Sequence, residues 1–151
     1  MRISLYRVFF DTSVYIAALI SPKGASGELI RLAEAGAITM VVSEQVVVES
    51  DRVLGKKFPG LVDESRRLWK VLRPEMAPEP TPKQVAPFRV RLSSGDASIL
   101  CAAQRVQVSS FVTWNTRDFM KPGIGEMVSF PIVVPEECLK RFRTWIQPYL
   151  D

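Results

Sequence analysis

Short apolar runs alternate along the chain with amphipathic segments. Continuous apolar or β-branched runs at residues 8–10, 38–42, 111–114 and 131–134 predict short strands covered on both faces, because a strand with one wet face would alternate apolar and polar positions. Between these runs, apolar positions recur three and four residues apart, as they do on one face of a helix. The alternation predicts an α/β protein whose strands are joined by helical crossovers and therefore run parallel.

Local start and stop residues delimit the helices. Ser26 and Ser43 are expected N-caps, Gly36 is an expected stop, and Pro135 suits a first helical turn. Five prolines between residues 74 and 87 argue against a regular helix or a central strand, so we interpret this segment as a rigid surface connection with room for a short helix. The predicted helices are residues 12–20, a segment between Ser26 and Gly36, residues 44–54, residues 61–72, a segment opening at Ser94 and Gly95, and a terminal segment from residue 135.

Composition narrows the classes of function. A length of 151 residues suits a single domain over residues 1–151. The longest uncharged runs have 11 residues, far fewer than the roughly 20 of a membrane span, and the two cysteines lack metal-type spacing, which favours a cytoplasmic location. The chain has no histidine, which excludes Ser-His-Asp and Cys-His catalysis and histidine-containing zinc sites. Carboxylate, lysine and metal chemistry remain, and the net charge of +4 favours a polyanionic partner.

Four acidic residues occupy comparable places, near the junctions between strands and helices. Asp11 follows the first strand, Glu49 borders the apolar face of its helix, Asp96 lies on the core-facing stripe one turn into another helix, and Asp118 lies beyond the carboxyl end of a strand. Functional groups of a parallel sheet collect at the carboxyl ends of its strands. We therefore expect these four carboxylates to converge and to act as the catalytic, metal-binding residues.

Clustered carboxylates without histidine suit Mg²⁺ or Mn²⁺, which take oxygen ligands. Like charges packed together repel, so such a cluster is stable as anions when a cation lies among them. A bound cation activates water and stabilises a leaving oxygen, chemistry that hydrolyses phosphodiesters. The side chains of Thr12, Ser13, Thr113 and Asn115 are expected to orient ligands or waters.

Each acid also has a plainer interpretation. Asp11 is placed to be an N-cap, and Asp96 to be a first-turn residue that interacts with the helix dipole. Glu49 has Arg52 and Lys56 nearby as ion-pair partners, and Asp118 is placed to cap a short helix beginning near residue 119. Their combined order and placement favour the metal site.

Basic residues gather in one arm of the chain. Between residues 52 and 73 there are seven basic residues and two acidic ones, which predicts a positive surface or, equally, a solvated helical face. We expect Arg52, Lys56, Lys57, Arg66 and Arg67 to contact nucleic-acid phosphates.

The ordered motifs resemble those of PIN domains over nearly the whole chain. They are Val8-Phe-Phe-Asp-Thr-Ser-Val14, Val42-Ser43 followed by Glu49, Asp96-Ala97 with its apolar neighbours, and Val112-Thr-Trp-Asn-Thr-Arg-Asp-Phe119. The resemblance implies a three-layer α/β/α fold with a central, mostly parallel sheet of about four to five strands. It also implies a Mg²⁺- or Mn²⁺-dependent endoribonuclease similar to VapC-type toxins, with an RNA substrate, an antitoxin protein and a homodimer as partners.

The resemblance implies roles for particular residues and shows departures. Asp11, Glu49 and Asp96 are implied metal ligands, and Asp118 is the fourth acid. Ser13 replaces the asparagine of the usual Asp-Thr-Asn sequence, and Asn115 stands where many members have aspartate.

Two other functions are alternatives to a metal-dependent ribonuclease. The first is a catalytically idle PIN-like module that binds RNA or protein. The second is a haloacid-dehalogenase-like phosphatase, which needs Asp-x-Asp, whereas Ser13 occupies the second position here. Residues 21–27 contain glycines but not the spacing of a phosphate-binding loop.

Overall fold

A five-stranded parallel sheet forms the centre of the computed structural model, which describes residues 5–151. The strand order is β3-β2-β1-β4-β5, and every neighbouring pair is parallel. The predicted α/β class and parallel sheet are confirmed, and residues 1–4 of the predicted domain lie outside the described residues. The strands are β1 (Arg7–Phe10), β2 (Thr39–Ser43), β3 (Glu75–Ala77), β4 (Ser110–Val112) and β5 (Ile132–Val133).

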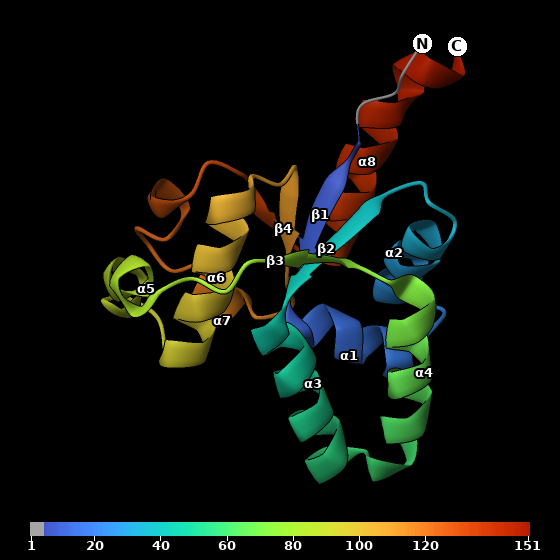
Figure 1. The fold of residues 1–151 in the computed structure, drawn as a ribbon. Helices are drawn as coiled ribbons and strands as arrows, with labels where there is room; N and C mark the ends of the chain where they lie inside the picture. Colours follow the sequence, from blue (N-terminus) through green and yellow to red (C-terminus); the bar gives the residue numbers. More distant parts are fainter. Residues whose placement is uncertain (1–4) are drawn as a thin grey trace.

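Helices cover both faces of this sheet, which confirms the predicted three layers. In Figure 1, α5, α6 and α7 lie on one side of the sheet, and α1, α2 and α4 lie on the other. Helix α8 packs against α2 and β4. The helices are α1 (Thr12–Ile20), α2 (Ala25–Glu34), α3 (Glu44–Lys57), α4 (Val62–Leu72), α5 (Pro82–Arg89), α6 (Ser94–Val106), α7 (Thr116–Phe119) and α8 (Pro135–Leu150), with 3₁₀ turns η1 (Pro59–Leu61) and η2 (Gly125–Met127). No helix within residues 5–151 combines the length and hydropathy that a membrane crossing requires.

The strand order places a topological switch between β1 and β4. From β1 the chain moves outward to β2 and β3 and then returns to the other side of β1 to form β4 and β5. Helices that follow β1 and β4 therefore diverge and leave a crevice at the carboxyl ends of these strands, where ligands of open α/β sheets bind. Asp11 directly follows β1 and Thr113 directly follows β4, so both residues lie at the carboxyl end of the sheet.

Aromatic packing explains why β1 and β4 are continuously apolar. Phe9 of β1 and Phe111 of β4 are fully buried, and their rings stack with centroids 5.5 Å apart. In the helical layer, Tyr15 of α1 stacks on Trp69 of α4 at a centroid distance of 3.9 Å. The first contact holds the two site-bearing strands together, and the second attaches the α3–α4 hairpin to the core.

The interpretation of the proline-rich segment was wrong in part. Residues 75–77 form β3, an edge strand, and residues 82–89 form a regular helix, α5. An edge strand leaves one side unpaired and so tolerates neighbouring prolines. Pro82 occupies the first turn, where its missing N–H costs nothing, and Thr81 and Gln84 complete a capping box. Pro87 lies in the last turn, so little helix follows it.

The predicted serine caps were also partly wrong. The N-cap of α2 is Gly24, and Ser26 lies inside the helix, where its buried Oγ accepts a hydrogen bond from Trp114 Nε1 at 2.8 Å. Ser43 does hold the N-cap position of α3, but its side chain makes no capping hydrogen bond. The side chain of Ser26, which was predicted to cap the helix, therefore makes a tertiary hydrogen bond with Trp114 instead.

Candidate functional site

Asp11 is the buried anchor of the site. It is 3% exposed, and although it holds the N-cap position of α1, its carboxylate makes no capping hydrogen bond there. Oδ2 instead accepts hydrogen bonds from Thr113 Oγ1 at 2.7 Å and from Ser13 Oγ at 2.8 Å. Both hydroxyls donate to one oxygen, so Oδ1 receives neither of these bonds.

The loop after β4 fixes the direction of both hydroxyls. The backbone N–H of Trp114 donates to Ser13 Oγ at 3.0 Å, and the N–H of Asn115 donates to Thr113 Oγ1 at 2.9 Å. Because each hydroxyl oxygen accepts from the loop, its own proton is free to point at Asp11. Ser13 and Thr113 therefore hold the carboxylate of Asp11, and the supporting role in orienting ligands or waters stays a prediction. Thr12 is outside this network, since its buried Oγ1 has no partner among the described residues.

Glu49 of α3 reaches the start of α6, where Asp96 lies. These helices pack against each other, and a Cβ placed on Gly95 would lie 3.4 Å from Glu49 Oε2. The carboxylate of Glu49 thus lies over the residue next to Asp96. None of the ion pairs among residues 5–151 includes Glu49, so the expected pairing with Arg52 or Lys56 is not observed.

Asp118 lies in the first turn of α7, and Asn115 is the N-cap. Asn115 Oδ1 accepts from the backbone N–H of Asp118 at 3.4 Å, and its Nδ2 donates to Asp118 Oδ2 at 3.1 Å. The other oxygen, Oδ1, lies 3.8 Å from Arg117 Nε and 3.7 Å from Lys121 Nζ. Asn115 therefore holds Asp118, and the expected cap near residue 119 is this asparagine.

The charges of the other three predicted acids act on Asp96, so the four carboxylates lie near one another. Burial, together with the negative charges of Asp11, Glu49 and Asp118, raises the pKa of Asp96 to about 6. Burial also raises the pKa of Asp11, Glu49 adds to this rise, and the hydroxyls of Thr113 and Ser13 oppose it. The structure thus brings the four predicted acids into range of one another from four different elements.

The donors fit Mg²⁺ or Mn²⁺ by their chemistry. Within residues 5–151, no three acidic or cysteine side chains lie close enough together to coordinate one metal ion directly. Mg²⁺ usually binds through one or two carboxylates and keeps several waters, so three direct ligands are not required. Neighbouring carboxylates with raised pKa values are the donor set that a hard cation stabilises as anions.

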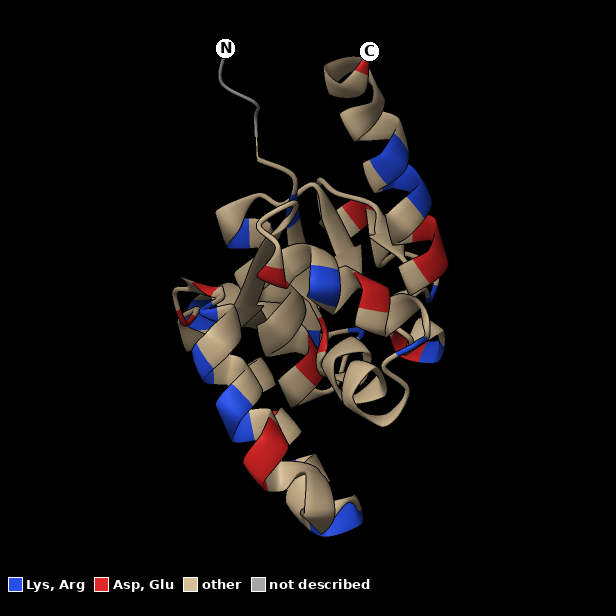
Figure 2. Cartoon of the chain, turned by 90° about the vertical axis from the view of Figure 1, so that its right-hand side faces the viewer, with Lys and Arg blue, Asp and Glu red and all other residues tan. Residues whose placement is uncertain are grey.

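The predicted basic residues lie on the α3–α4 hairpin, which projects from the body (Figures 1 and 2). All five are exposed, and Arg66 pairs with Asp51 at 3.1 Å. Arg117 and Lys121, which were not singled out from the sequence, lie nearer to the acids. Their positions in the sequence, one residue before and three residues after Asp118, could have indicated that they lie beside this acid. The five predicted residues are Arg52, Lys56, Lys57, Arg66 and Arg67.

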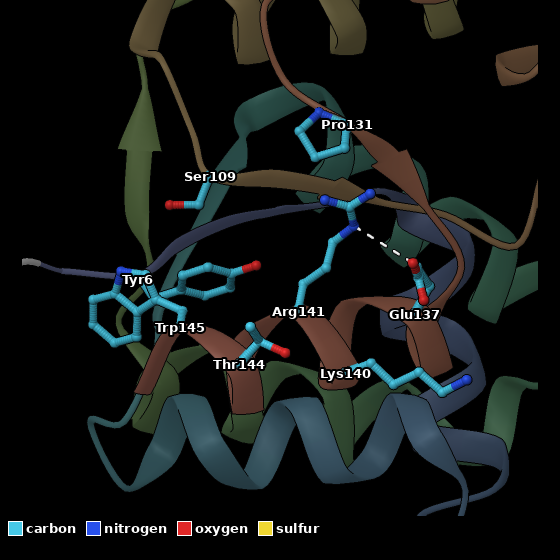
Figure 3. A pocket seen from close by; sticks show the side chains of 8 residues that line it. All are labelled: Tyr6, Ser109, Pro131, Glu137, Lys140, Arg141, Thr144 and Trp145. Atoms are coloured by element: carbon cyan, nitrogen blue, oxygen red, sulfur yellow. Dashed lines mark ion pairs between the residues drawn. The ribbon is translucent and has the colours of Figure 1, made fainter. Parts of the chain in front are cut away.

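A cavity lies away from the acids. It has a volume of about 540 Å³ between α8 and the amino ends of the central strands, and its lining includes Tyr6, Ser109 and Arg141 (Figure 3). Arg141 pairs with Glu137 at 3.7 Å. Because the acids occupy the carboxyl ends of the strands, this cavity is at the opposite end of the sheet and contributes nothing to the site.

Solved structures with similar folds cover most of the chain. PAE2754 from Pyrobaculum aerophilum is 19% identical, with a TM-score of 0.65 over 93% of this chain and 99% of that one. VapBC2 from Rickettsia felis, bound to a DNA fragment from its promoter, is 13% identical, with a TM-score of 0.62 over 85% and 98%. VapC20 from Mycobacterium tuberculosis, a toxin that cleaves the sarcin-ricin loop, is 20% identical, with a TM-score of 0.56 over 77% and 95%.

A comparison of the sequence with curated proteins gave no significant match. A family model described as PIN domain matches residues 7–117. The matched segment begins with β1 and ends at the start of α7, so it contains Asp11, Glu49 and Asp96 together with the hydroxyl network around Asp11. The chain therefore belongs to the PIN domain family, a family of nuclease-type proteins.

Proposed function

We propose that this protein is a Mg²⁺- or Mn²⁺-dependent endoribonuclease that hydrolyses phosphodiester bonds of single-stranded or structured RNA. The observation that carries the proposal is the buried carboxylate of Asp11, held by Thr113 and Ser13 in the crevice where the charges of Asp11, Glu49 and Asp118 help to raise the pKa of Asp96. Such an arrangement opposes folding unless the charges are used, so it favours a catalytic role over a structural one.

The chain supplies the ligands and their orientation. Asp11, Glu49 and Asp96 would hold the cation, one or two of them directly and the rest through its waters, and Asp118 would act as the fourth acid. When bound, a divalent cation neutralises phosphate charge and lowers the pKa of a coordinated water. Thr113 and Ser13 both donate to Asp11 Oδ2 and so leave Oδ1 without a hydroxyl donor. Arg117 and Lys121 lie beside Asp118, where they are placed to attract RNA phosphates.

The test is cleavage of single-stranded RNA by the purified protein with Mg²⁺ or Mn²⁺. We expect 5′-phosphate products from the wild type and at least a hundredfold slower cleavage by Asp11→Asn and by Asp96→Asn, because each variant loses an anionic ligand. Glu79→Gln, an exposed acid in the loop before α5, is the matched control and should cleave normally. Equal cleavage by wild type and both aspartate variants, or cleavage that persists in EDTA, would refute the proposal.

The same preparations separate this function from an idle RNA- or protein-binding module. A cation that binds the folded state raises the melting temperature by mass action. We expect Mn²⁺ to raise it in the wild type and to raise it less in Asp96→Asn. A melting temperature indifferent to Mn²⁺ in both would favour the idle module.

A toxin role in a toxin–antitoxin pair extends the proposal. It is supported by the fold similarity to VapBC complexes from Rickettsia felis and Salmonella typhimurium. A small open reading frame beside this gene, whose product co-purifies with the protein and suppresses cleavage, would support it. A homodimer belongs to the same proposal, and sedimentation analysis would measure it.

A further inference from the structure

Trp114 is a large aromatic side chain that lies partly in solvent at the edge of the candidate site. It follows Thr113 directly in the loop after β4, and 41% of its surface is exposed. The phenylalanines of the neighbouring strands and of α7 are buried, among them Phe9, Phe10, Phe111 and Phe119. Core packing therefore does not account for the position of Trp114.

Hydrogen bonds hold this tryptophan at both ends. Its backbone N–H donates to Ser13 Oγ, which in turn donates to Asp11 Oδ2, so only one side chain separates its backbone from the buried carboxylate. Its indole Nε1 donates to the buried Oγ of Ser26 in α2 at 2.8 Å. A ring fixed in this way loses little conformational freedom when a ligand packs against it.

Open space lies beside the ring. A cavity of about 210 Å³ is lined by Trp114, by the small residues Gly24, Ala25 and Ser26, and by Glu136 at the start of α8. Small side chains leave room for a flat group. Trp114 directly follows Thr113, the residue that donates to Asp11, so the cavity adjoins the loop that holds the buried carboxylate.

We infer that Trp114 is a stacking platform for a base of the RNA substrate next to the scissile phosphate, an inference that rests on the proposed function. Unpaired bases stack on aromatic side chains, and the interaction tolerates any base because each has a π-face. In this arrangement the acids act on the scissile phosphate, and the indole of Trp114 positions the adjoining nucleotide. Ser26 is a positioning residue that sets the orientation of the ring.

The test measures binding of a short single-stranded oligoribonucleotide in EDTA, where cleavage is not needed. Stacking of one base predicts that Trp114→Ala weakens binding about tenfold, whereas Trp114→Phe keeps a ring and most of the affinity. RNA should also quench the tryptophan fluorescence of the wild type more than that of Trp114→Phe. Tyr149→Ala removes an aromatic residue of similar exposure from the end of α8 and should bind normally.

Ser26→Ala supplies a second measurement and should give a smaller loss than Trp114→Ala, because the ring remains but is no longer held. An oligonucleotide lacking one base next to the cleaved bond should bind the wild type about tenfold more weakly, with no additional loss in Trp114→Ala. Wild-type affinity in Trp114→Ala, or a loss of the same size in Tyr149→Ala, would overturn the inference. If the binding results hold but the wild type does not cleave RNA, the proposed nuclease function fails and Trp114 stands as a stacking platform for bound RNA.

Discussion

At the scale of single residues, two carboxylates of one crevice have different surroundings. Asp11 is nearly inaccessible and is partly compensated by hydroxyl donors. Asp96 lies at the start of α6, and three acidic neighbours add their charges to the effect of burial on its pKa. The negative charge of Asp96 is therefore unfavourable in the folded protein near neutral pH.

This cost gives a prediction for stability against pH. Because the folded-state pKa of about 6 exceeds the ordinary 3.8, the folded state binds the proton more tightly, and stability falls as pH rises from about 4 through 6. In EDTA at pH 7, Asp96→Asn should raise the free energy of unfolding by roughly 1–2 kcal/mol, less than the full shift implies because the carboxyl keeps some solvent contact. Urea unfolding at pH 7 and pH 4 checks this.

The gain should be much smaller at pH 4, because there the carboxyl of Asp96 is protonated in the folded state and roughly half protonated in the unfolded state. Glu79→Gln serves again as the exposed control and should change stability at neither pH. An equal gain at both pH values would mean that the asparagine stabilises the fold for another reason than charge.

At the scale of elements, the junction before α2 shows how closely the site's framework is packed. A Cβ on Gly27 would lie 1.9 Å from the carbonyl oxygen of Pro22. This glycine lets the loop after α1 press against the first turn of α2, next to Ser26 and hence next to Trp114. Gly55 in α3, in contrast, has no neighbour within 4 Å of its Cβ position.

Two alanine substitutions should therefore have opposite effects. Gly27→Ala should lower the free energy of unfolding by about 1–3 kcal/mol, because backbone has to move to relieve the overlap. Gly55→Ala should raise it by up to about 1 kcal/mol, because an exposed helical position gains the better helix former. Denaturant unfolding measures both, and a Gly27→Ala protein as stable as the wild type would contradict the close approach.

At the scale of the whole molecule, charge is distributed unevenly around a site that is itself acidic. The α3–α4 hairpin carries the predicted basic residues on its exposed surface, away from the body of the sheet (Figure 2). Arg66 is partly neutralised by Asp51, whereas Lys56 and Lys57 are exposed at the end of α3. The hairpin is thus placed to attract a polyanion at a distance from the acids.

Replacing Lys56, Lys57, Arg66 and Arg67 with glutamine should weaken RNA binding at low salt and reduce the slope of log affinity against log salt, because fewer phosphates are neutralised. Each lost phosphate contact should lower that slope by about 0.7 for a single strand. Titrations at several salt concentrations measure it. Unchanged binding at low salt would remove the hairpin from the RNA interface. Replacing Lys83 and Arg89 of α5 removes two positive charges elsewhere and should weaken binding less per charge than the hairpin substitutions do.

Much of the fold and of the site was predictable from local features. The buried strands were evident from continuous apolar runs, and the four acids from their positions at strand and helix ends, because both depend on a few neighbouring residues. The family resemblance assembled these local features into a site. The strand near residue 75, the helix from Pro82 and the true role of Ser26 were not predictable in this way, since an edge position and a contact with Trp114 decide them.

The sequence by itself determined the parallel α/β class, the absence of histidine chemistry and which carboxylates follow which strands. Only the tertiary structure decided that β4 lies beside β1, and with it that Thr113 and Ser13 share one oxygen of Asp11 and that Trp114 faces open space. The reason is physical. Hydrophobic periodicity acts within one element, whereas strand order and side-chain convergence depend on packing between residues about a hundred positions apart.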